Sequence, residues 1–375
     1  MVNNIINKPQ DTKTVDVLEI INTFQTTRYQ GSKRKILPWL YDCTKDIDFE
    51  TVLDAFGGSG MVSCLFKHMG KKVTYNDIFK FNKIIGESTI ENNNVLLTED
   101  DIKHILEPKN AKFSFISNTF KDIYYLNDEN NWLDMAIYNI ESLSDIYKGK
   151  ELRFKKAIAY NALFQACMAK RPYNLFHRKN LNMRIRNVKR NFGNKSTWDK
   201  PFPVHFVNFV NEINKSIYDS GKKCRTICSD VFSIKQTNYD AVYLDPPYIK
   251  RKGERNETAD YLGCYHFLEG IANYSSWPQI IESDSPNKRI QKSYAPNYFT
   301  GSDASELFER LIKKFRKCVI ILSYKYGGDP TIDDLSKIIL KYKTQLKVYD
   351  RHYKYALNKK NRDETINREY LIIGY

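Results

Sequence analysis

The sequence contains no hydrophobic run long enough to cross a bilayer. Residues 318–322, CVIIL, form one of its most apolar stretches, whereas a spanning helix needs about 20 such residues. The first twenty residues carry no apolar segment of the kind that secretory signal peptides contain. Hydrophobic residues still make up 42% of the chain, which is enough for a sizeable core. We therefore expect a soluble, globular, cytoplasmic protein with no membrane partner.

Cysteine is also scarce. Seven cysteines are scattered through 375 residues, and this odd, low number does not indicate a disulfide framework. Cys224 and Cys228 form a CxxxC pair, but no second pair and no nearby histidine completes a zinc site. The sequence therefore predicts no metal centre.

Acidic residues are outnumbered by basic ones. The chain has 59 lysines and arginines against 44 aspartates and glutamates, which gives a net charge of +15. Such an excess indicates a polyanionic partner, and nucleic acid is a commoner partner than a membrane surface. A generally basic proteome or simple solubility would produce the same number, so the positions of the charges must decide.

The two ends of the chain alternate between strand and helix patterns. Residues 51–56 form a buried-strand pattern, the glycine-rich 57–60 follows, and 71–77 is a second strand pattern that ends in an acid. This order predicts an α/β fold that opens on a parallel sheet. Further strands are expected at 240–244, 317–323, 346–355 and 369–375, with helices at 304–316 and 331–343.

The middle of the chain is different. Residues from about 100 to 220 contain no clear parallel-strand pattern, and 151–170 has helical spacing. Between Lys170 and Lys200 there are ten lysines or arginines and one acid, Asp199. We interpret this region as an insertion that forms a second lobe. The predicted division is 28–100 for the first half of the core, 101–214 for the inserted lobe and 215–375 for the second half.

The first strand leads into the pattern Asp54-x-Phe56-x-Gly58-x-Gly60. Glycines after a first strand allow a ligand to approach the backbone closely. The dinucleotide fingerprint GxGxxG is absent, so a pyrophosphate site is not indicated. Asp77, at the end of the second strand, is placed to accept the ribose hydroxyls of a nucleoside. S-adenosylmethionine fits this description, and a glycine-rich turn without a ligand is the alternative.

Two further stretches carry weaker signals. In residues 27–37, TRYQGSKRKIL, Lys33 is predicted to meet a carboxylate from a lid, or else to lie in a solvated turn. In residues 228–234, Asp230 follows a predicted strand end, where it can contact an adenine ring or simply cap a turn.

The strand at 240–244 ends in Asp245-Pro246-Pro247-Tyr248. The exocyclic amine of a base is a poor nucleophile, and the Asp245 carboxylate and the Pro246 carbonyl are two acceptors that can hold its hydrogens. Tyr248 can stack on the base, a contact worth about 1–3 kcal/mol. The two prolines stiffen the backbone and fix these groups before the substrate arrives.

Together these motifs resemble those of the D12-class N6-adenine-specific DNA methyltransferases, in the alpha-group order. The segments are YQGSK, DAFGGSG, YNDI, SDV and DPPY, and the resemblance extends over most of 28–375. It implies a Rossmann-like class I S-adenosylmethionine-dependent methyltransferase sheet with an inserted, mainly helical target-recognition lobe. It also implies cofactor contacts from the lid residues Tyr29, Gly31 and Lys33, from Asp77 to ribose, and from Asp230 and Val231 to adenine. His266 and Glu269 are expected to pack or cap.

The resemblance places target recognition in the basic lobe. Double-stranded DNA is then the expected partner, and a separate restriction endonuclease acting on the same site is a candidate second one. Phosphates and bases would be contacted by basic side chains. Of the aromatics among them, Tyr173, Phe176, Phe192 and Trp198, most are expected to be lobe core. The predicted DNA-binding residues are Lys170, Arg171, Arg178, Lys179, Arg184, Arg186, Lys189 and Arg190.

The expected activity is transfer of a methyl group from S-adenosylmethionine to N6 of an adenine flipped out of the duplex. The cysteine nucleophile of C5-cytosine enzymes would lie in a Pro-Cys pair, and this sequence has none. Two alternatives remain open. One is methylation of RNA adenine or of a protein amide, and the other is a nucleic-acid-binding module with a degenerate cofactor site.

Overall fold

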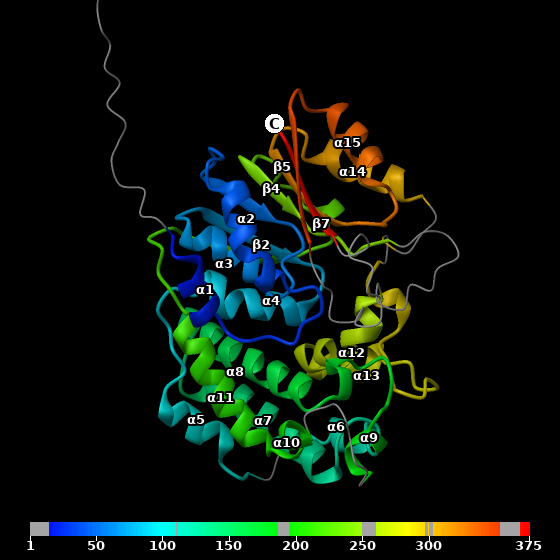
Figure 1. Ribbon diagram of the computed structural model, residues 1–375. Helices are drawn as coiled ribbons and strands as arrows, with labels where there is room; N and C mark the ends of the chain where they lie inside the picture. Colours follow the sequence, from blue (N-terminus) through cyan, green and yellow to red (C-terminus); the bar gives the residue numbers. More distant parts are fainter. Residues whose placement is uncertain are drawn as a thin grey trace, which may run out of the picture.

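The computed structural model describes residues 15–109, 112–186, 195–249, 260–296, 299, 303–352 and 368–375. Figure 1 shows a sheet with its flanking helices in one half of the molecule and a group of helices in the other. Helix α4 (Lys80–Gly86) lies between the two halves, because it contacts both the sheet and the longest helix of the helical half.

The sheet has seven strands in the order β3-β2-β1-β4-β5-β7-β6. Each strand expected from the sequence is present within a few residues of its predicted bounds. The sheet opens on parallel strands as expected, and β7 pairs antiparallel with both β5 and β6. In the sheet, β7 lies between β5 and β6. The strands are β1 (Thr51–Asp54), β2 (Lys72–Asp77), β3 (Arg225–Cys228), β4 (Ala241–Leu244), β5 (Val319–Lys325), β6 (Leu346–His352) and β7 (Arg368–Gly374).

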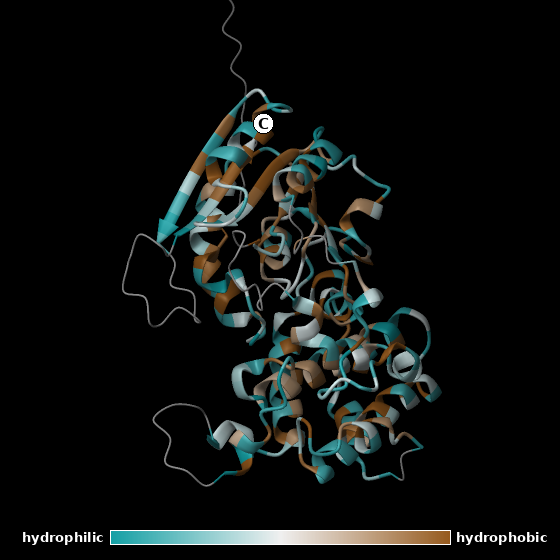
Figure 2. Cartoon of the chain, turned by 90° about the vertical axis from the view of Figure 1, so that its right-hand side faces the viewer, coloured by the Kyte–Doolittle hydropathy of each residue, from teal (hydrophilic) through white to brown (hydrophobic). Residues whose placement is uncertain are grey.

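Both faces of the inner strands β4 and β5 are buried, so the sequences of these strands are mostly apolar rather than alternating. Val52 and Leu53 illustrate the pleat, since they point into different core clusters. One face packs on α1 (Val17–Thr23), α2 (Leu37–Thr44) and α3 (Met61–His68), and the other on α14 (Ala304–Lys314) and α15 (Ile332–Leu340). In Figure 2 the inner strands are largely brown, whereas the edge strand β6 is partly teal and mostly exposed.

The described part of the chain between β2 and β3 forms helices and contributes no strand to the sheet. Its centre is α8 (Gly149–Ala169), in which the residues from Phe154 to Ala169 are nearly all buried and mostly apolar. The helices of this half are α5 (Glu99–Leu106), α6 (Phe115–Thr119), α7 (Asn127–Ser142), α8 (Gly149–Ala169), α9 (Asn182–Ile185), α10 (Lys195–Asp199) and α11 (Phe202–Ser216).

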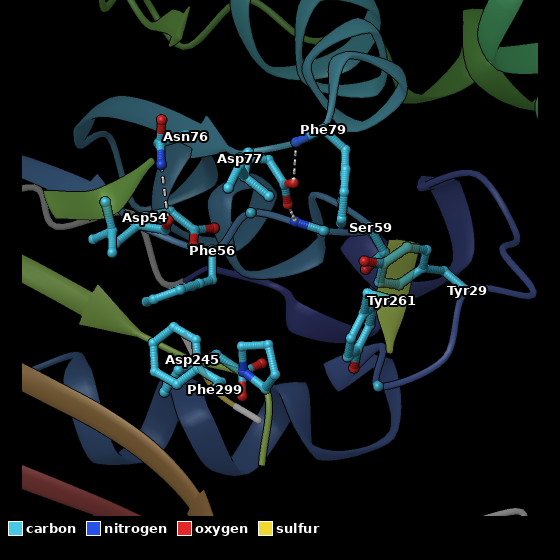
Figure 3. Close-up of a pocket in the computed structure, with 18 of the residues that line it drawn as sticks. Tyr29, Asp54, Phe56, Ser59, Asn76, Asp77, Phe79, Asp245, Tyr261 and Phe299 are labelled. Atoms are coloured by element: carbon cyan, nitrogen blue, oxygen red, sulfur yellow. Dashed lines mark hydrogen bonds between the residues drawn. The ribbon is translucent and has the colours of Figure 1, made fainter. Parts of the chain in front are cut away.

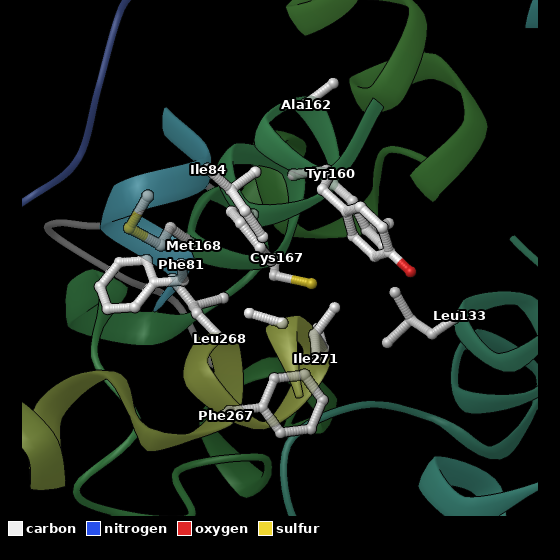
Figure 4. Packing of buried hydrophobic residues seen from close by; sticks show 14 of the residues in the cluster. Phe81, Ile84, Leu133, Tyr160, Ala162, Cys167, Met168, Phe267, Leu268 and Ile271 are labelled. Carbon is white, nitrogen blue, oxygen red and sulfur yellow. The ribbon is translucent and has the colours of Figure 1, made fainter. Parts of the chain in front are cut away.

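A second chain segment joins this helical half. Helices α12 (Tyr261–Ala272) and α13 (Trp277–Ile280) lie between β4 and β5 in sequence, yet they pack in the same core cluster as α7 and α8. Figure 4 shows Phe267, Leu268 and Ile271 of α12 beside Cys167 of α8. The predicted boundary at residue 215 misses this, because a helix sequence does not reveal which core it joins.

His266 and Glu269 of α12, which the sequence predicts to pack or cap, are both buried and hydrogen-bonded. Glu269 accepts hydrogen bonds from the backbone N–H groups of Lys80 and Phe81, both at 3.0 Å, and so caps the start of α4. His266 lies 2.7 Å from the Tyr124 hydroxyl in the core of the helical half. Glu269 therefore caps a helix and His266 packs in a core, as the sequence predicts.

Short helical turns complete the connections: η1 (Lys33–Ile36), the π-helical η2 (Glu87–Glu91), η3 (Leu143–Asp145), η4 (Pro172–Asn174), η5 (Val231–Ser233), η6 (Tyr274–Ser276) and η7 (Lys292–Tyr294). Within the described ranges, none of the helices has the length and apolar character needed to cross a membrane.

Candidate active site

A cavity of about 480 Å³ opens at the carboxyl ends of β1, β2 and β4. In open α/β sheets this edge is where ligands bind, at the point where the strand order reverses. Figure 3 shows Asp54 and Asp77 on one side of the cavity and Asp245 with Phe299 across from them. The structure brings together most of the predicted site residues as lining: Tyr29, Gly31, Lys33, Asp54, Phe56, Gly58, Asp77, Asp230, Val231, Asp245, Pro246, Pro247 and Tyr248.

Gly60 is the exception among the predicted cofactor residues. It does not line the cavity but caps the start of α3 in a left-handed conformation, with φ of 78°. A Cβ added there would face Phe24 and Ile90 rather than a ligand. The glycine is therefore explained by backbone geometry, and its prediction as a ligand contact is wrong.

The Tyr75 ring supports the glycine loop from below. A Cβ at Gly57 would lie 2.1 Å from this ring, and one at Gly86 on α4 would lie 2.7 Å from it. The Tyr75 hydroxyl donates to the Gly58 carbonyl at 2.8 Å. The ring thus occupies the space that both glycines leave and fixes the loop between β1 and α3.

The two carboxylates on this side of the cavity differ in their bonding. Asp77 accepts from the N–H groups of Gly58 and Phe79, each at 3.0 Å. Asp54 accepts from the Ser63 hydroxyl at 2.6 Å through Oδ2, while its buried Oδ1 has no partner among the described residues. Burial raises the pKa of Asp54 to about 7 and also raises the pKa of Asp77.

Asp245 lies opposite, directly after β4, with 17% of its side chain exposed. The Lys33 ammonium contacts both of its oxygens, at 2.7 and 2.8 Å, so the predicted meeting of Lys33 with a carboxylate is confirmed. Burial raises the pKa of Asp245 to about 6, with Lys33 opposing that effect. Burial also works against the charge of Lys33, but its carboxylate neighbours outweigh it and raise the lysine pKa.

A second carboxylate, which the sequence analysis did not identify, completes this group. Glu369 at the start of β7 is fully buried, and its Oε1 lies 3.3 Å from Lys33 Nζ. The Tyr248 hydroxyl donates to the same oxygen at 2.6 Å, and the Ser323 hydroxyl donates at 2.7 Å. In the sequence Glu369 is one acid at the edge of an apolar strand pattern, and such a residue carries no signal of a site.

Aromatic side chains wall the remaining side of the cavity. The Tyr29 ring stacks on Tyr265 of α12 with centroids 4.8 Å apart, and the Tyr265 hydroxyl accepts from the backbone N–H of Gln30 at 2.7 Å. The lid is therefore docked on α12, which also places Tyr261 in the cavity. Figure 3 shows Tyr29 and Tyr261 next to each other. Other lining residues that the sequence did not single out are Asn76, which lies within the YNDI segment, and Phe79 and Phe299, which lie outside the quoted motifs.

Asp230 lies at the third strand end, where the sequence analysis left two interpretations. It caps η5 by accepting from the Phe232 N–H at 3.0 Å, and it also lines the cavity beside Val231. Capping and lining are both compatible with its position.

Three of the predicted DNA-binding cations are buried in the helical half, which contradicts their prediction. Lys170 and Arg171 are each 1% exposed and Arg184 is 8% exposed. Arg184 makes a two-pronged pair with Glu129 at 2.7 and 2.8 Å, and Lys170 contacts the same carboxylate at 2.8 Å. Arg171 donates to backbone carbonyls, among them that of Leu175 at 3.1 Å. These cations hold loops together, because a buried charge must be paired or hydrogen-bonded.

The rest of the basic segment has a different position. Arg178, Lys179 and Arg186 are exposed, whereas Lys189 and Arg190 lie outside the described residues. Of the interleaved aromatics, Phe176 and Trp198 are buried as expected, and Tyr173 is 56% exposed. Phe192 and the charged residues 250–259 also lie outside the described ranges.

A sheet of this topology, with an acid at each of three strand ends around one cavity, is consistent with the class I methyltransferase fold. The model of the family described as D12 class N6 adenine-specific DNA methyltransferase matches residues 29–324, and the chain belongs to this family. It is therefore an adenine-specific DNA methyltransferase that acts on N6.

Curated relatives agree with this assignment. The chain is 26% identical over 344 residues to the type II methyltransferase M2.HphI of Haemophilus parahaemolyticus, covering 90% of this chain and 94% of that protein. It is 25% identical to the modification methylase StsI of Streptococcus sanguinis, over 84% of this chain and 46% of that protein. It is 23% identical to the type II methyltransferase M.FokI of Planomicrobium okeanokoites, over 92% of this chain and 52% of that protein. The chain thus spans about half the length of the last two.

Proposed function

We propose that the methyl donor is S-adenosylmethionine and that Asp245, Pro246 and Tyr248 receive an adenine flipped out of duplex DNA. The observation that carries this proposal is the position of Asp245. It lies across one cavity from Asp54 and Asp77, so a nucleoside ligand and a base can meet between them. The family membership supports DNA adenine over RNA or a protein amide as the acceptor.

The lining residues fit this donor. A volume of about 480 Å³ lies within the range of roughly 300–1,000 Å³ that small-ligand pockets occupy. The unpartnered Oδ1 of Asp54 is suited to an ammonium group, and Asp77 is placed for ribose hydroxyls. Asp230 and Val231 would border the adenine ring, while Tyr29 and Phe56 offer aromatic surface. When bound, the donor supplies an electrophilic methyl group on a sulfonium.

The residues around Asp245 would prepare the acceptor. A carboxylate at this position accepts one hydrogen of the adenine amine, and the Pro246 carbonyl accepts the other. The lone pair of N6 is then held toward the methyl group, and alignment of the two reacting atoms supplies much of the rate. The Tyr248 ring, fixed at its hydroxyl by Glu369, gives the base a surface on which to stack. On transfer, N6 would gain the methyl group as the bond from this methyl to the sulfonium sulfur breaks, leaving a neutral thioether, and Asp245 would accept the proton that N6 releases.

The helical half is the proposed DNA-recognition lobe. Its exposed cations Arg178, Lys179 and Arg186 would contact phosphates and base edges. We extend the same role to Lys189 and Arg190 on sequence alone. A separate restriction endonuclease that cuts the same site remains a candidate partner.

The test is transfer of labelled methyl from S-adenosylmethionine to duplex DNA, followed by digestion to nucleosides. N6-methyladenine should carry the label, and single-molecule sequencing of DNA from an expressing host should locate it at one sequence. Label on cytosine, on RNA alone or on protein would overturn the proposal. Calorimetry with S-adenosylmethionine addresses the degenerate-site alternative, which predicts no binding.

A further inference from the structure

In the buried cluster beneath Tyr248, two carboxylates of the described chain meet one lysine. Lys33 Nζ is the single cation recorded among the described residues of the cluster, and it is shared by Asp245 at 2.7 Å and Glu369 at 3.3 Å. In a site of low polarity, charged groups that lie this close have large effects on one another.

Three contacts of Glu369 converge on one of its oxygens. Oε1 accepts from the Tyr248 and Ser323 hydroxyls and lies near Lys33, so three different elements meet at this atom. The residue comes from β7, 121 positions after Tyr248 in the chain. It also lies beyond residues 29–324, to which the family model is matched.

We propose that Glu369 is a positioning residue for methyl transfer, which fixes Tyr248 through its hydroxyl and draws Lys33 partly away from Asp245. If Lys33 paired with Asp245 alone, the Asp245 carboxylate would be a weaker acceptor for the adenine amine. Sharing Lys33 with Glu369 keeps Asp245 available as an acceptor. The same contact holds the Tyr248 ring in one orientation, because a tyrosine anchored at its hydroxyl loses its freedom to swing. This inference rests on the proposed roles of Asp245 and Tyr248.

Other ionisable groups also face Asp245 and must be counted. They are Tyr248 itself, Tyr243 on β4, Tyr261 on α12 and Asp54 on β1. Tyr243 and Tyr261 are neutral below their pKa values, which burial raises, and burial raises the pKa of Asp54 to about 7. After burial, Lys33 and Glu369 are the charged neighbours with the largest opposing effects on the pKa of Asp245.

Glu369→Gln separates charge from shape. The amide oxygen can still accept from Tyr248 and Ser323, but the negative charge is lost and Lys33 then pairs with Asp245 alone. We expect kcat to fall on the order of tenfold, while KM for donor and DNA changes little. The acid limb of kcat/KM should move to lower pH by on the order of one unit, because a neighbouring negative charge no longer raises the pKa of Asp245.

Glu369→Asp is the complementary change, since it keeps the charge and shortens the reach. It should lower kcat while leaving the acid limb near its wild-type position, and it remains informative if the Gln variant does not fold. Glu269→Gln is the matched control. It also removes a buried carboxylate, but from the cap of α4, so it should lower the melting temperature without moving the acid limb.

The outcomes are distinct. A wild-type enzyme that transfers no methyl to adenine contradicts the proposed function itself. If the wild type is active and folded Glu369→Gln has a wild-type kcat and pH profile, only the role of Glu369 is wrong. If Glu369→Gln does not fold, an unchanged kcat in Glu369→Asp overturns the inference. A shift of the acid limb in Glu269→Gln equal to that in Glu369→Gln would also overturn it.

Discussion

Two regions of this molecule bury cations, and they do so for opposite purposes. At the strand ends, Lys33 is 6% exposed and lies between two carboxylates at the edge of an open cavity. In the helical half, Lys170 and Arg184 are buried to a similar degree, but they converge on one carboxylate, Glu129, and on backbone carbonyls. Among the residues that the structure describes, the first group has two carboxylates around one ammonium beside a ligand-sized space. The second has two cations around one carboxylate, and carbonyl oxygens also accept from these cations.

The difference shows how a structural buried charge can be distinguished from a functional one. Burial costs free energy in both places, so pairing alone does not identify function. A charged group whose bonding is completed within the fold stabilises the fold. A charged group that borders a cavity, with its pKa shifted and acceptor capacity unused, is poised for a ligand. Asp54 and Asp245 are of the second kind, and Glu129 is of the first.

The largest expected effect comes from Asp245→Ala. It should reduce methyl transfer on the order of 10³-fold, because the amine loses its charged acceptor. Donor affinity measured by calorimetry should stay within a few-fold of wild type, since Asp54 and Asp77 lie on the other side of the cavity. Near-normal turnover in this variant would contradict the functional role assigned to Asp245.

Arg184→Ala should act on folding instead. It removes the two-pronged partner of Glu129, which keeps its contact with Lys170 and its hydrogen bond from the Leu126 N–H. We expect the free energy of unfolding to fall by about 3 kcal/mol, as for other broken buried pairs. Denaturant unfolding measures this, with the exposed Arg186→Ala as the matched control. Equal stability of the two variants would contradict the structural assignment of Arg184.

The pH dependence distinguishes the regions further. Asp245 must be ionised to accept from the amine, and its pKa is about 6 in the free protein. Activity is therefore retained above this value and lost as the pH falls through it, so kcat/KM should drop about tenfold per unit below pH 6. Circular dichroism at each pH verifies that the chain is still folded. An acid limb near pH 4 would mean that another group controls the rate.

The smallest effect is expected from the exposed cations. Arg178→Ala and Arg186→Ala should each weaken DNA binding several-fold and reduce the slope of log K against log salt by about 1. Their melting temperatures should stay near wild type. If neither variant changes the slope, the DNA lies on another face of the helical half.

The sequence predicted those parts of the site in which residues adjacent in the chain determine both the chemistry and the backbone geometry. Asp54, Asp77 and Asp245 could be predicted as one site, because each ends a strand pattern and parallel strands end at one edge. Lys170, Arg171 and Arg184 could not be separated from exposed Arg178, because a run of cations does not state which of them face inward. Glu369 could not be found at all, since its partnership depends on β7 inserting beside β5.

The Tyr75 ring has a consequence for how this sequence can vary. Gly57 and Gly86 are far apart in the chain, yet each leaves room for the same ring, at 2.1 and 2.7 Å from a virtual Cβ. A side chain at either glycine is admissible only together with a smaller residue at 75, and that change would also remove the bond to the Gly58 carbonyl. The three positions are thus coupled. A single substitution at any of them is expected to be harmful, and a tolerated change needs at least two substitutions.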